Sequence, residues 1–215
     1  MAQLFDPSGD GKRLHAPASM RNRDVIFDVL SPKLKSQPTG SLIFEIASGT
    51  GEHAAYMAPK LPRHLWQPSD IDSQHIASID AWRHETAAQS VQPARHFNIL
   101  KDSFHAPQLP APLAVIMAVN LLHISPWVVA ETLMEKACPA LPSGGLLYLY
   151  GPYKRGGAHT AESNAQFDAS LKSRDSSWGI RDMESVIDCA ESAGFRSPEI
   201  TPMPANNFSL VFAKV

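Results

Sequence analysis

A short apolar run that ends in a glycine turn constrains this chain more than any other stretch. Residues 42–46 (LIFEI) are typical of a strand covered on both faces, as in a parallel sheet. Residues 48–51 (SGTG) follow, and Gly49 and Gly51 permit positive φ and close approach of a ligand to the backbone. Residues 52–61 then favour a helix, which Pro59 ends early. A helix that begins at such a turn presents unpaired N–H groups to a ligand.

Glu45 is the unusual residue of this run. A carboxylate inside a buried strand is costly unless it is paired or meets a cation. Either Glu45 lies at the open end of the strand in water, or a bound ligand carries positive charge. S-adenosylmethionine (SAM) carries an α-ammonium and a sulfonium. Gly49, Gly51 and Ala54 also fit a dinucleotide-binding fingerprint, so the glycines alone do not choose the cofactor, and Glu45 favours SAM.

An acidic residue stands where a ribose-binding group is expected. Residues 65–70 are predicted to form the second strand, and Asp70 lies 19 positions beyond Gly51. An acid at that spacing, at the end of a strand, is placed to bind ribose hydroxyls. Asp72 is expected to cap the helix predicted over residues 73–88.

The rest of the chain alternates predicted helices and strands. Residues 1–16 are expected to be irregular, and Ser125 with Pro126 is expected to begin a helix as N-cap and first residue. The predicted helices cover residues 17–30, 127–141 and 183–193, and the remaining strands cover residues 94–100, 113–119 and 146–150, followed by a closing hairpin of 199–203 and 208–214. This order favours an α/β fold.

Polar and aromatic residues follow the fourth and fifth predicted strands. Ligands of doubly wound sheets bind outside the carboxyl ends of the strands, where Asn120, Leu121 and His123 are expected. His123 is either a packing residue or a base facing the substrate, since a histidine can titrate near neutrality. Residues 151–182 are rich in Tyr, Asn, Trp and Arg, and form either a substrate lid or a polar surface helix. The candidate substrate contacts are Tyr150, Asn164, Phe167, Trp178 and Arg181.

Size and charge exclude several classes of function. The 215 residues suit one domain, and the net charge of −2 gives no sign of a nucleic-acid footprint. No run is long enough to cross a membrane, and the N-terminus lacks the apolar core of an export signal. Cys138 and Cys189 are expected to be reduced thiols, which predicts a cytosolic protein. The sequence predicts no metal site.

The first motif resembles that of a large enzyme family. Glu45-x-Ala47-x-Gly49-x-Gly51 is similar to the acid-x-Gly-x-Gly-x-Gly run of the class I SAM-dependent methyltransferases, with Ala47 in place of the first glycine. The wider set of motifs resembles the uncharacterised family of methyltransferase-like protein twenty-six, a domain of unknown function. This set comprises Arg21-Asn22, residues 45–53, Pro68-Ser69-Asp70, Asn120 with residues 123–127, Tyr150-Gly151-Pro152 and residues 178–182.

The resemblance implies a fold and a set of roles. The fold is a Rossmann-like class I methyltransferase fold with a mostly parallel seven-stranded sheet, a C-terminal antiparallel hairpin and helices on both faces. It would be one domain over residues 1–215, with an N-terminal lid helix within 1–40 and the lid insertion 151–182. The cofactor is SAM, with S-adenosylhomocysteine as product. The implied cofactor-binding residues are Arg21, Asn22, Glu45, Ala47, Ser48, Gly49, Gly51, Asp70, Ile71, Asn98, Ile99, Asn120 and Leu121.

The expected activity is methyl transfer to an unidentified small molecule. If the acceptor must lose a proton, His123 is the candidate base and Tyr153 the second candidate. Two alternatives stay open, a SAM-binding module without turnover and an NAD(P)-dependent oxidoreductase.

Overall fold

The chain divides into two compact units. The computed structural model describes residues 13–86, 89–105 and 108–215. One unit comprises Met1–Asn98 and Ala106–Met117, and the other comprises Ile99–His105 and Ala118–Val215. The expectation of a single domain stays a prediction.

The elements follow one another in the expected α/β order. The first unit contains α1 (Pro17–Leu34), β1 (Leu42–Ile46), α2 (Glu52–Met57), the 3-10 helix η1 (Ala58–Lys60), β2 (Leu65–Asp70), α3 (Ser73–Thr86) and β3 (Arg95–His96). Strand β4 (Leu113–Val119) has residues in both units. The second unit contains α4 (Trp127–Ala140), β5 (Leu146–Arg155), β6 (Ala158–His159), α5 (Glu162–Arg174), β7 (Arg181–Asp182), α6 (Met183–Ser192), β8 (Glu199–Met203), the 3-10 helix η3 (Pro204–Asn206) and β9 (Asn207–Ala213).

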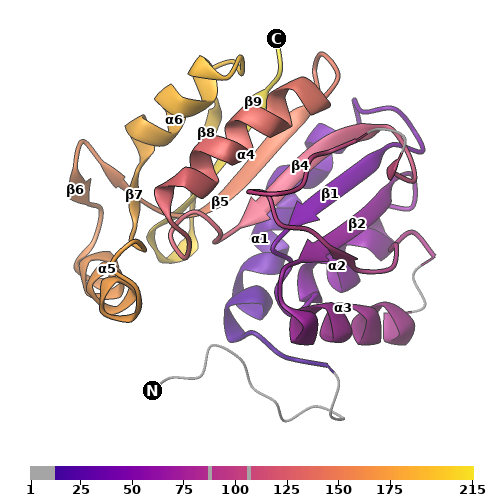
Figure 1. Cartoon of the computed structure of the whole chain (residues 1–215), viewed down its shortest axis with the longest axis horizontal. Helices are drawn as coiled ribbons and strands as arrows, with labels where there is room; N and C mark the ends of the chain where they lie inside the picture. Colours follow the sequence, from indigo (N-terminus) through magenta and orange to yellow (C-terminus); the bar gives the residue numbers. More distant parts are fainter. Residues whose placement is uncertain (1–12, 87–88, 106–107) are drawn as a thin grey trace. The chain divides into compact units, whose positions relative to one another are not determined.

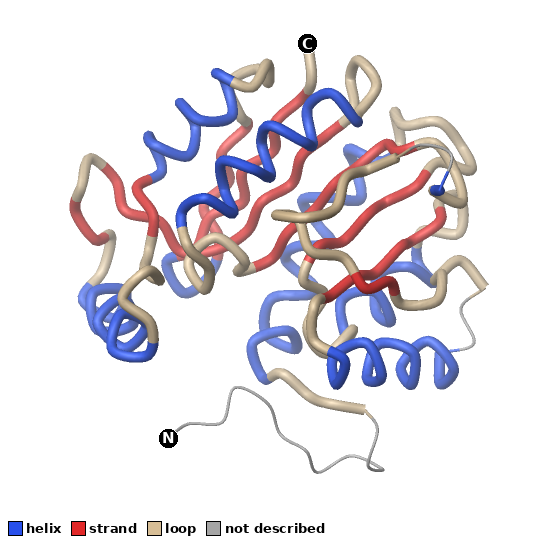
Figure 2. Tube along the Cα trace, in the orientation of Figure 1, coloured by secondary structure: helices blue, strands red, loops and turns tan. Residues whose placement is uncertain are grey.

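The strands pair in the order β3-β2-β1-β4-β5-β9-β8 (Figures 1 and 2). Strands β1, β2 and β3 are parallel, whereas β9 is antiparallel to both β5 and β8. The predicted α/β class, the mostly parallel sheet and the C-terminal antiparallel hairpin are therefore confirmed. The sheet has two short strands beyond the seven predicted, because β6 and β7 pair with the far end of β5.

Close packing in the first unit explains one glycine of the turn. All five residues of β1 are buried. Helix α2 contacts both α1 and α3. A Cβ on Gly51 would lie 2.7 Å from Cα of Ile79 in α3, and Gly51 has φ +91°. Only glycine combines this backbone conformation with this approach of α3.

In the second unit, β5 is longer than predicted. It continues past Tyr150 to Arg155, and its first eight residues are buried. Strand β9 pairs with it from Leu146↔Ala213 to Pro152↔Asn207. Helices α4 and α6 pack against each other and lie side by side in Figure 1. The two short strands of the insertion, β6 and β7, both pair with this extension of β5.

Several predicted boundaries were wrong. The third strand shrinks from residues 94–100 to Arg95–His96, and the helix over 52–61 is divided between α2 and η1. Ser125 is not an N-cap: Pro126 holds that position, and Ser125 Oγ donates to the Leu121 carbonyl at 2.8 Å. Residues 1–12 and 87–88, which carried further predictions, lie outside the described residues. None of the helices in the described ranges is both long enough and apolar enough to cross a bilayer.

Candidate functional site

The turn after β1 has three residues with left-handed backbone. Ala47 has φ 52°, Gly49 has φ 58° and Gly51 has φ 91°. A Cβ on Gly49 would meet no atom within 4 Å, so there is open space beside this residue. Ala47 adopts a conformation that costs a non-glycine residue roughly 1–2 kcal/mol. The structure therefore places Ala47 in a conformation for which glycine is the favoured residue.

Asp70 holds the glycine turn. Its Oδ2 accepts a hydrogen bond from Gly49 N–H at 2.9 Å, while its Oδ1 accepts from the N–H groups of Ile71 and Asp72. His75 Nδ1 lies 3.2 Å from the same Oδ1. Burial opposes ionisation, but the bonds from His75, Asp72 and Gly49 outweigh it and lower the pKa of Asp70. Asp70 is thus an ionised acceptor.

Asp72 is the helix cap that the sequence predicted. Its Oδ1 accepts from Gln74 N–H at 2.7 Å and from His75 N–H at 3.4 Å. Ile71, between the two acids, is 62% exposed. The capping role leaves Asp70 as the acid available at the end of β2.

Glu45 is buried and lacks a full set of partners. It is 1% exposed. Its Oε2 accepts from the indole N–H of Trp66 at 2.9 Å, while the buried Oε1 has no hydrogen-bond partner among the described residues. The expectation that Glu45 lies in water at the open end of the strand is therefore wrong. Burial raises its pKa to about 7, against the lowering effect of Trp66.

A neutral histidine lies next to Glu45. His53 Nδ1 is 3.6 Å from Glu45 Oε1, and His53 Nε2 is 2.8 Å from Asn22 Oδ1. Burial, together with the charge of Arg23, lowers the pKa of His53 to about 4. A neutral His53 beside a protonated Glu45 makes this a neutral pair between about pH 4 and pH 7, although the distance alone resembles an ion pair.

The residues before α1 are tied to the turn by a contact that sequence reasoning missed. Buried Glu52 accepts from Ala16 N–H at 2.7 Å and from Thr50 Oγ1 at 2.9 Å, and its Oε1 lies 3.3 Å from His15 Nδ1. Ser78 Oγ adds a second tie, since it accepts from Leu14 N–H and donates to the Thr50 carbonyl. In the sequence, this contact was indicated by the acidic residue Glu52 at the first position of α2.

Four predicted cofactor-binding residues outside the glycine turn, Arg21, Asn22, Asn98 and Ile99, differ in burial. Asn22 is buried against His53, whereas its neighbour Arg21 is exposed. Asn98 is half-buried. Ile99 is buried, and its carbonyl accepts from Lys136 Nζ at 2.6 Å. The roles of all four residues toward a cofactor stay predictions.

In the second unit, His123 lies at the turn after β4. Asn120, with φ 61°, donates its N–H to the Tyr150 carbonyl at 2.8 Å. A Cβ on Gly151 would lie 3.1 Å from His123 Nδ1, so Gly151 makes room for the imidazole. The Phe167 ring lies edge-on at 5.6 Å between centroids. Leu121 is half-buried.

His123 does not titrate near neutrality, which favours the packing interpretation, and its role as a base stays a prediction. Burial, together with the charge of Arg181, lowers the pKa of His123 to about 3. Burial also raises the pKa of Tyr153 well above its usual value. Both side chains are therefore neutral at physiological pH, and the imidazole is the better proton acceptor of the two.

Most of the predicted substrate contacts have structural partners. The guanidinium of Arg181 donates to the carbonyls of Leu122 and Ser177. Asn164 donates to Thr160 Oγ1 and to the Asn206 carbonyl, both at 3.1 Å. Tyr150 is buried and Trp178 is half-buried, whereas Phe167 is 39% exposed. Phe167 is therefore the most accessible member of the set.

Asp168 anchors the insertion, and sequence reasoning did not single it out. Its Oδ1 accepts from Ile180 N–H at 2.7 Å, and its Oδ2 lies 2.7 Å from Lys172 Nζ and 3.3 Å from His159 Nε2. Burial opposes ionisation, but these donors prevail and lower the pKa of Asp168. The i,i+4 spacing of Asp168 and Lys172 was the sequence signal.

Several solved structures that are similar to this chain are methyltransferases. An O-methyltransferase family protein from Burkholderia thailandensis matches with a TM-score of 0.77 and 16% identity, over 92% of this chain and 56% of that one. Human N-acetylserotonin methyltransferase in complex with SAM matches with a TM-score of 0.73 and 15% identity, over 92% and 52%. An O-methyltransferase family 2 protein from Planctomyces limnophilus in complex with apigenin matches with a TM-score of 0.72 and 16% identity, over 97% and 66%.

These likenesses establish the fold. The chain spans little more than half the length of the first two structures. It has the α/β Rossmann-like methyltransferase fold, with a mostly parallel sheet, antiparallel C-terminal strands and helices on both faces, as predicted. A family model described as "Protein of unknown function (DUF938)" matches residues 13–214. Since that match covers nearly the whole chain, the protein belongs to the DUF938 family of proteins of unknown function.

Proposed function

We propose that this protein is a SAM-dependent methyltransferase that acts on a small molecule in the cytosol. The observation that carries the proposal is the buried carboxylate of Glu45, whose Oε1 has no hydrogen-bond partner among the described residues. A buried carboxylate oxygen without a partner is destabilising unless a cationic ligand completes its surroundings. The narrower resemblance to the family of methyltransferase-like protein twenty-six is part of the proposal and rests on sequence motifs.

The residues around the glycine turn fit the cofactor. The open space at Gly49 admits a ligand close to the backbone, and Glu45 offers an acceptor to an ammonium group. Asp70 Oδ2 accepts one hydrogen bond from Gly49, and a carboxylate oxygen has capacity for a second. In the proposal, Glu45 and residues 47–51 hold the methionine part, Asp70 and Ile71 hold the ribose, and Asn98 and Ile99 hold the adenine. SAM would supply a methyl group activated by its sulfonium.

The residues proposed to contact the methyl acceptor, His123 and Tyr153, belong to the second unit. Neutral His123 can accept a hydrogen bond from an acidic N–H or O–H of the acceptor and so orient it. Its low pKa makes it a weak base, so the proposal assigns it positioning first and proton acceptance second. Protonated Tyr153 would donate a hydrogen bond. Positioning and exclusion of water would supply most of the rate enhancement.

Calorimetry with SAM, S-adenosylhomocysteine and NAD tests the cofactor. We expect SAM or its demethylated product to bind with a Kd in the micromolar range or tighter, about −8 kcal/mol, and NAD to give no heat. Tight NAD binding without heat from either SAM-type ligand would overturn the proposal in favour of an oxidoreductase.

A screen of a metabolite extract with methyl-labelled SAM tests turnover. Transfer of label to a small molecule supports the enzyme, and His123→Gln should then lower kcat while leaving the Kd for SAM unchanged. SAM binding without transfer to any compound of a broad extract would favour the alternative, a binding module without turnover.

A further inference from the structure

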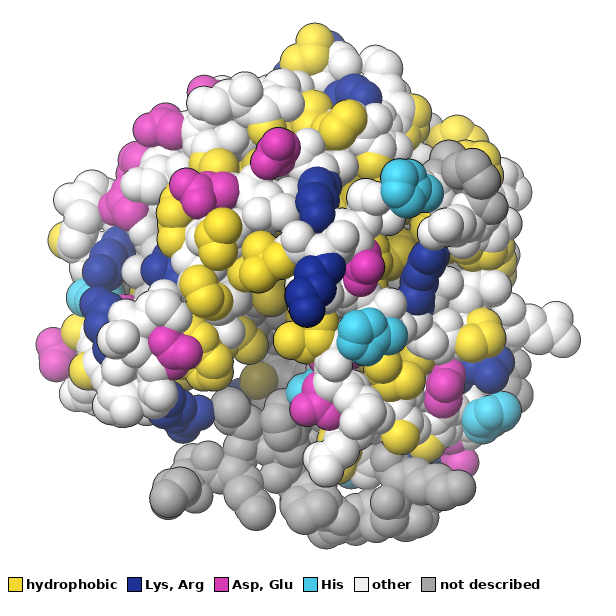
Figure 3. Space-filling model, viewed as in Figure 1, with side chains coloured by type: hydrophobic (Ala, Val, Ile, Leu, Met, Phe, Trp, Pro, Cys, Tyr) yellow, Lys and Arg dark blue, Asp and Glu magenta, His cyan; other side chains and the backbone are white. Residues whose placement is uncertain are grey.

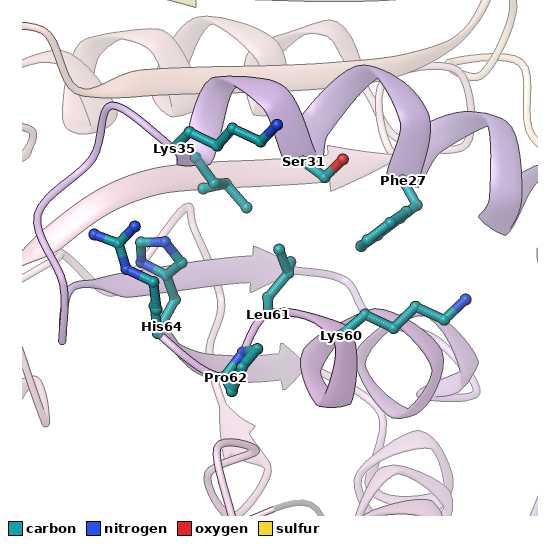
Figure 4. A pocket seen from close by; sticks show the side chains of 9 residues that line it. Phe27, Ser31, Lys35, Lys60, Leu61, Pro62 and His64 are labelled. Atoms are coloured by element: carbon teal, nitrogen blue, oxygen red, sulfur yellow. The ribbon is translucent and has the colours of Figure 1, made fainter.

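A hollow in the first unit lies away from the glycine turn. Figure 4 shows it between α1 and the chain that runs from η1 into β2, and its volume is about 330 Å³. Helix α1 contributes Phe27, Ser31 and Leu34 to its lining, and η1 with the following loop contributes Lys60, Leu61 and Arg63. This volume lies at the lower end of the range for small-molecule sites, roughly 300–1,000 Å³.

The hollow and the glycine turn lie at opposite ends of β2. Arg63 and His64 directly precede the first residue of β2, whereas Asp70 is its last residue and bonds Gly49. Six residues of strand span about 17 Å. The hollow is therefore not part of the proposed cofactor site.

The lining has an apolar floor. Leu34 and Leu61 are buried. In Figure 4 the Leu61 side chain points from the loop towards α1, and Phe27 reaches from α1 towards it. Such a surface favours the apolar body of a ligand rather than a bare inorganic ion.

The rim is cationic. Lys35, Lys60 and Arg63 are exposed, and the described lining residues include no carboxylate. On the face of the molecule that Figure 3 shows, by contrast, basic and acidic side chains are interspersed. His64 adds no charge near neutrality, because burial lowers its pKa and its Nδ1 lies 3.1 Å from Ser41 Oγ.

Two of the three cations are held in place. Lys60 Nζ lies 3.3 Å from the centre of the Tyr56 ring and 5.2 Å from that of Phe27. Arg63 Nε and Nη2 both donate to Thr39 Oγ1, at 3.0 and 2.6 Å, and a guanidinium has five N–H groups in all. Fixed cations lose less conformational entropy when an anion binds.

We propose that this hollow binds a small organic anion, with its apolar body against Phe27, Leu34 and Leu61. Its carboxylate or phosphate group would lie at the rim, beside one of the cations Lys35, Lys60 and Arg63. This site is independent of methyl transfer, since none of its lining residues belongs to the proposed cofactor or acceptor sets.

Amide NMR shifts of the full-length ¹⁵N-labelled protein test the site without any cofactor. The probes are phenyl phosphate and phenylacetate, with benzyl alcohol as the neutral comparison and inorganic phosphate as the anion without an apolar body. We expect saturable shifts at Ser31, Leu61 and Arg63 with at least one aryl anion, and binding at least tenfold weaker for the alcohol and for inorganic phosphate. Which aryl anion binds more tightly distinguishes a phosphate ligand from a carboxylate ligand.

Two variants separate the charge from the apolar floor. Lys35→Gln/Arg63→Gln should weaken the aryl anion at least fivefold, whereas the matched surface change Lys101→Gln/Arg174→Gln should leave its affinity unchanged. Ser31→Phe should fill the hollow and abolish binding while the three cations stay in place. Because all these positions are outside the core, an unchanged amide spectrum elsewhere confirms that each variant folds.

Three results would overturn the proposal. They are no saturable shift with either aryl anion up to about 10 mM, equal binding of benzyl alcohol or inorganic phosphate, and equal weakening by the matched surface variant.

Discussion

Glu45 in the first unit and Asp168 in the second are both buried carboxylates, but their surroundings differ. Asp168 meets a backbone N–H and a lysine at 2.7 Å each, and its pKa is lowered. Glu45 meets one indole N–H and a neutral histidine, and its pKa is raised to about 7. A carboxylate saturated by its own chain is part of the scaffold. A carboxylate with an oxygen left over is where a cationic ligand fits, and the difference could not be read from burial alone.

The largest expected effect is on the affinity for SAM, which should fall in a variant of Glu45 but not in a variant of Asp168. Glu45→Gln should weaken SAM roughly 10- to 100-fold, because a hydrogen bond to a charged group contributes about 1.5–3 kcal/mol. Calorimetry measures the Kd of the variant. Asp168→Asn is the matched control and should bind SAM as the wild type does. Equal losses in the two variants would break the comparison.

The second effect separates them by stability. Asp168→Asn should lower the free energy of unfolding by about 1–2 kcal/mol, since it leaves Ile180 N–H and the Lys172 ammonium without their carboxylate. Urea unfolding monitored by circular dichroism measures this. Glu45→Gln should not destabilise at pH 8, because it removes a carboxylate whose ionisation burial disfavours. A larger loss in the Glu45 variant would contradict this interpretation.

The third effect is on the pH dependence of stability. The pKa of Glu45 is raised from 4.5 to about 7, so its contribution to stability is lost as pH rises through that window. The pKa of His53 is lowered from 6.5 to about 4, so its contribution is lost as pH falls through that window. Between pH 4.5 and 6.5 the two residues change the free energy of unfolding with pH in opposite directions. In this range, folding moves one proton from His53 to Glu45.

Glu45→Gln removes the contribution of Glu45 to the pH dependence of stability and leaves that of His53. The variant should therefore lose stability relative to the wild type on acidification from about pH 7 to pH 4.5, the window of Glu45, by about 1 kcal/mol per pH unit. Melting temperatures of both proteins at several pH values between 5 and 8 measure the difference, and other titrating groups are common to both. If the melting temperatures of the two proteins change with pH in the same way, Glu45 does not bind this proton in the folded protein.

The smallest effect concerns Ala47. Ala47→Gly should stabilise the free protein by about 0.5–1 kcal/mol, since glycine adopts φ 52° without the penalty of a Cβ but costs more backbone entropy. Thermal unfolding measures it, with Gly51→Ala as the opposite change, which should destabilise because of Ile79. A stability loss in Ala47→Gly would mean that the Ala47 methyl contributes packing.

Parts of the site that depend on local pattern were predictable from sequence. The boundaries of β1, β2 and β4 follow from short apolar runs between turn residues, and the cap at Asp72 follows from its place before a helix. The parallel α/β order and the closing hairpin follow in the same way. In each case the neighbours in sequence are also the neighbours in space.

Tertiary structure alone decided the electrostatics. Glu52 and His53 lie within a quoted motif but were assigned no partner, because their partners lie far away in the chain: Asn22 is 31 residues from His53, and Ala16 is 36 from Glu52. The pKa of His123 depends on burial and on Arg181, neither of which its neighbours in sequence reveal. The sequence by itself determined where a glycine turn lies and that an acid stands beside it. Only the packing of distant segments, which removes water and supplies or withholds hydrogen-bond donors, decided which acid has an oxygen without a partner among residues 13–86, 89–105 and 108–215.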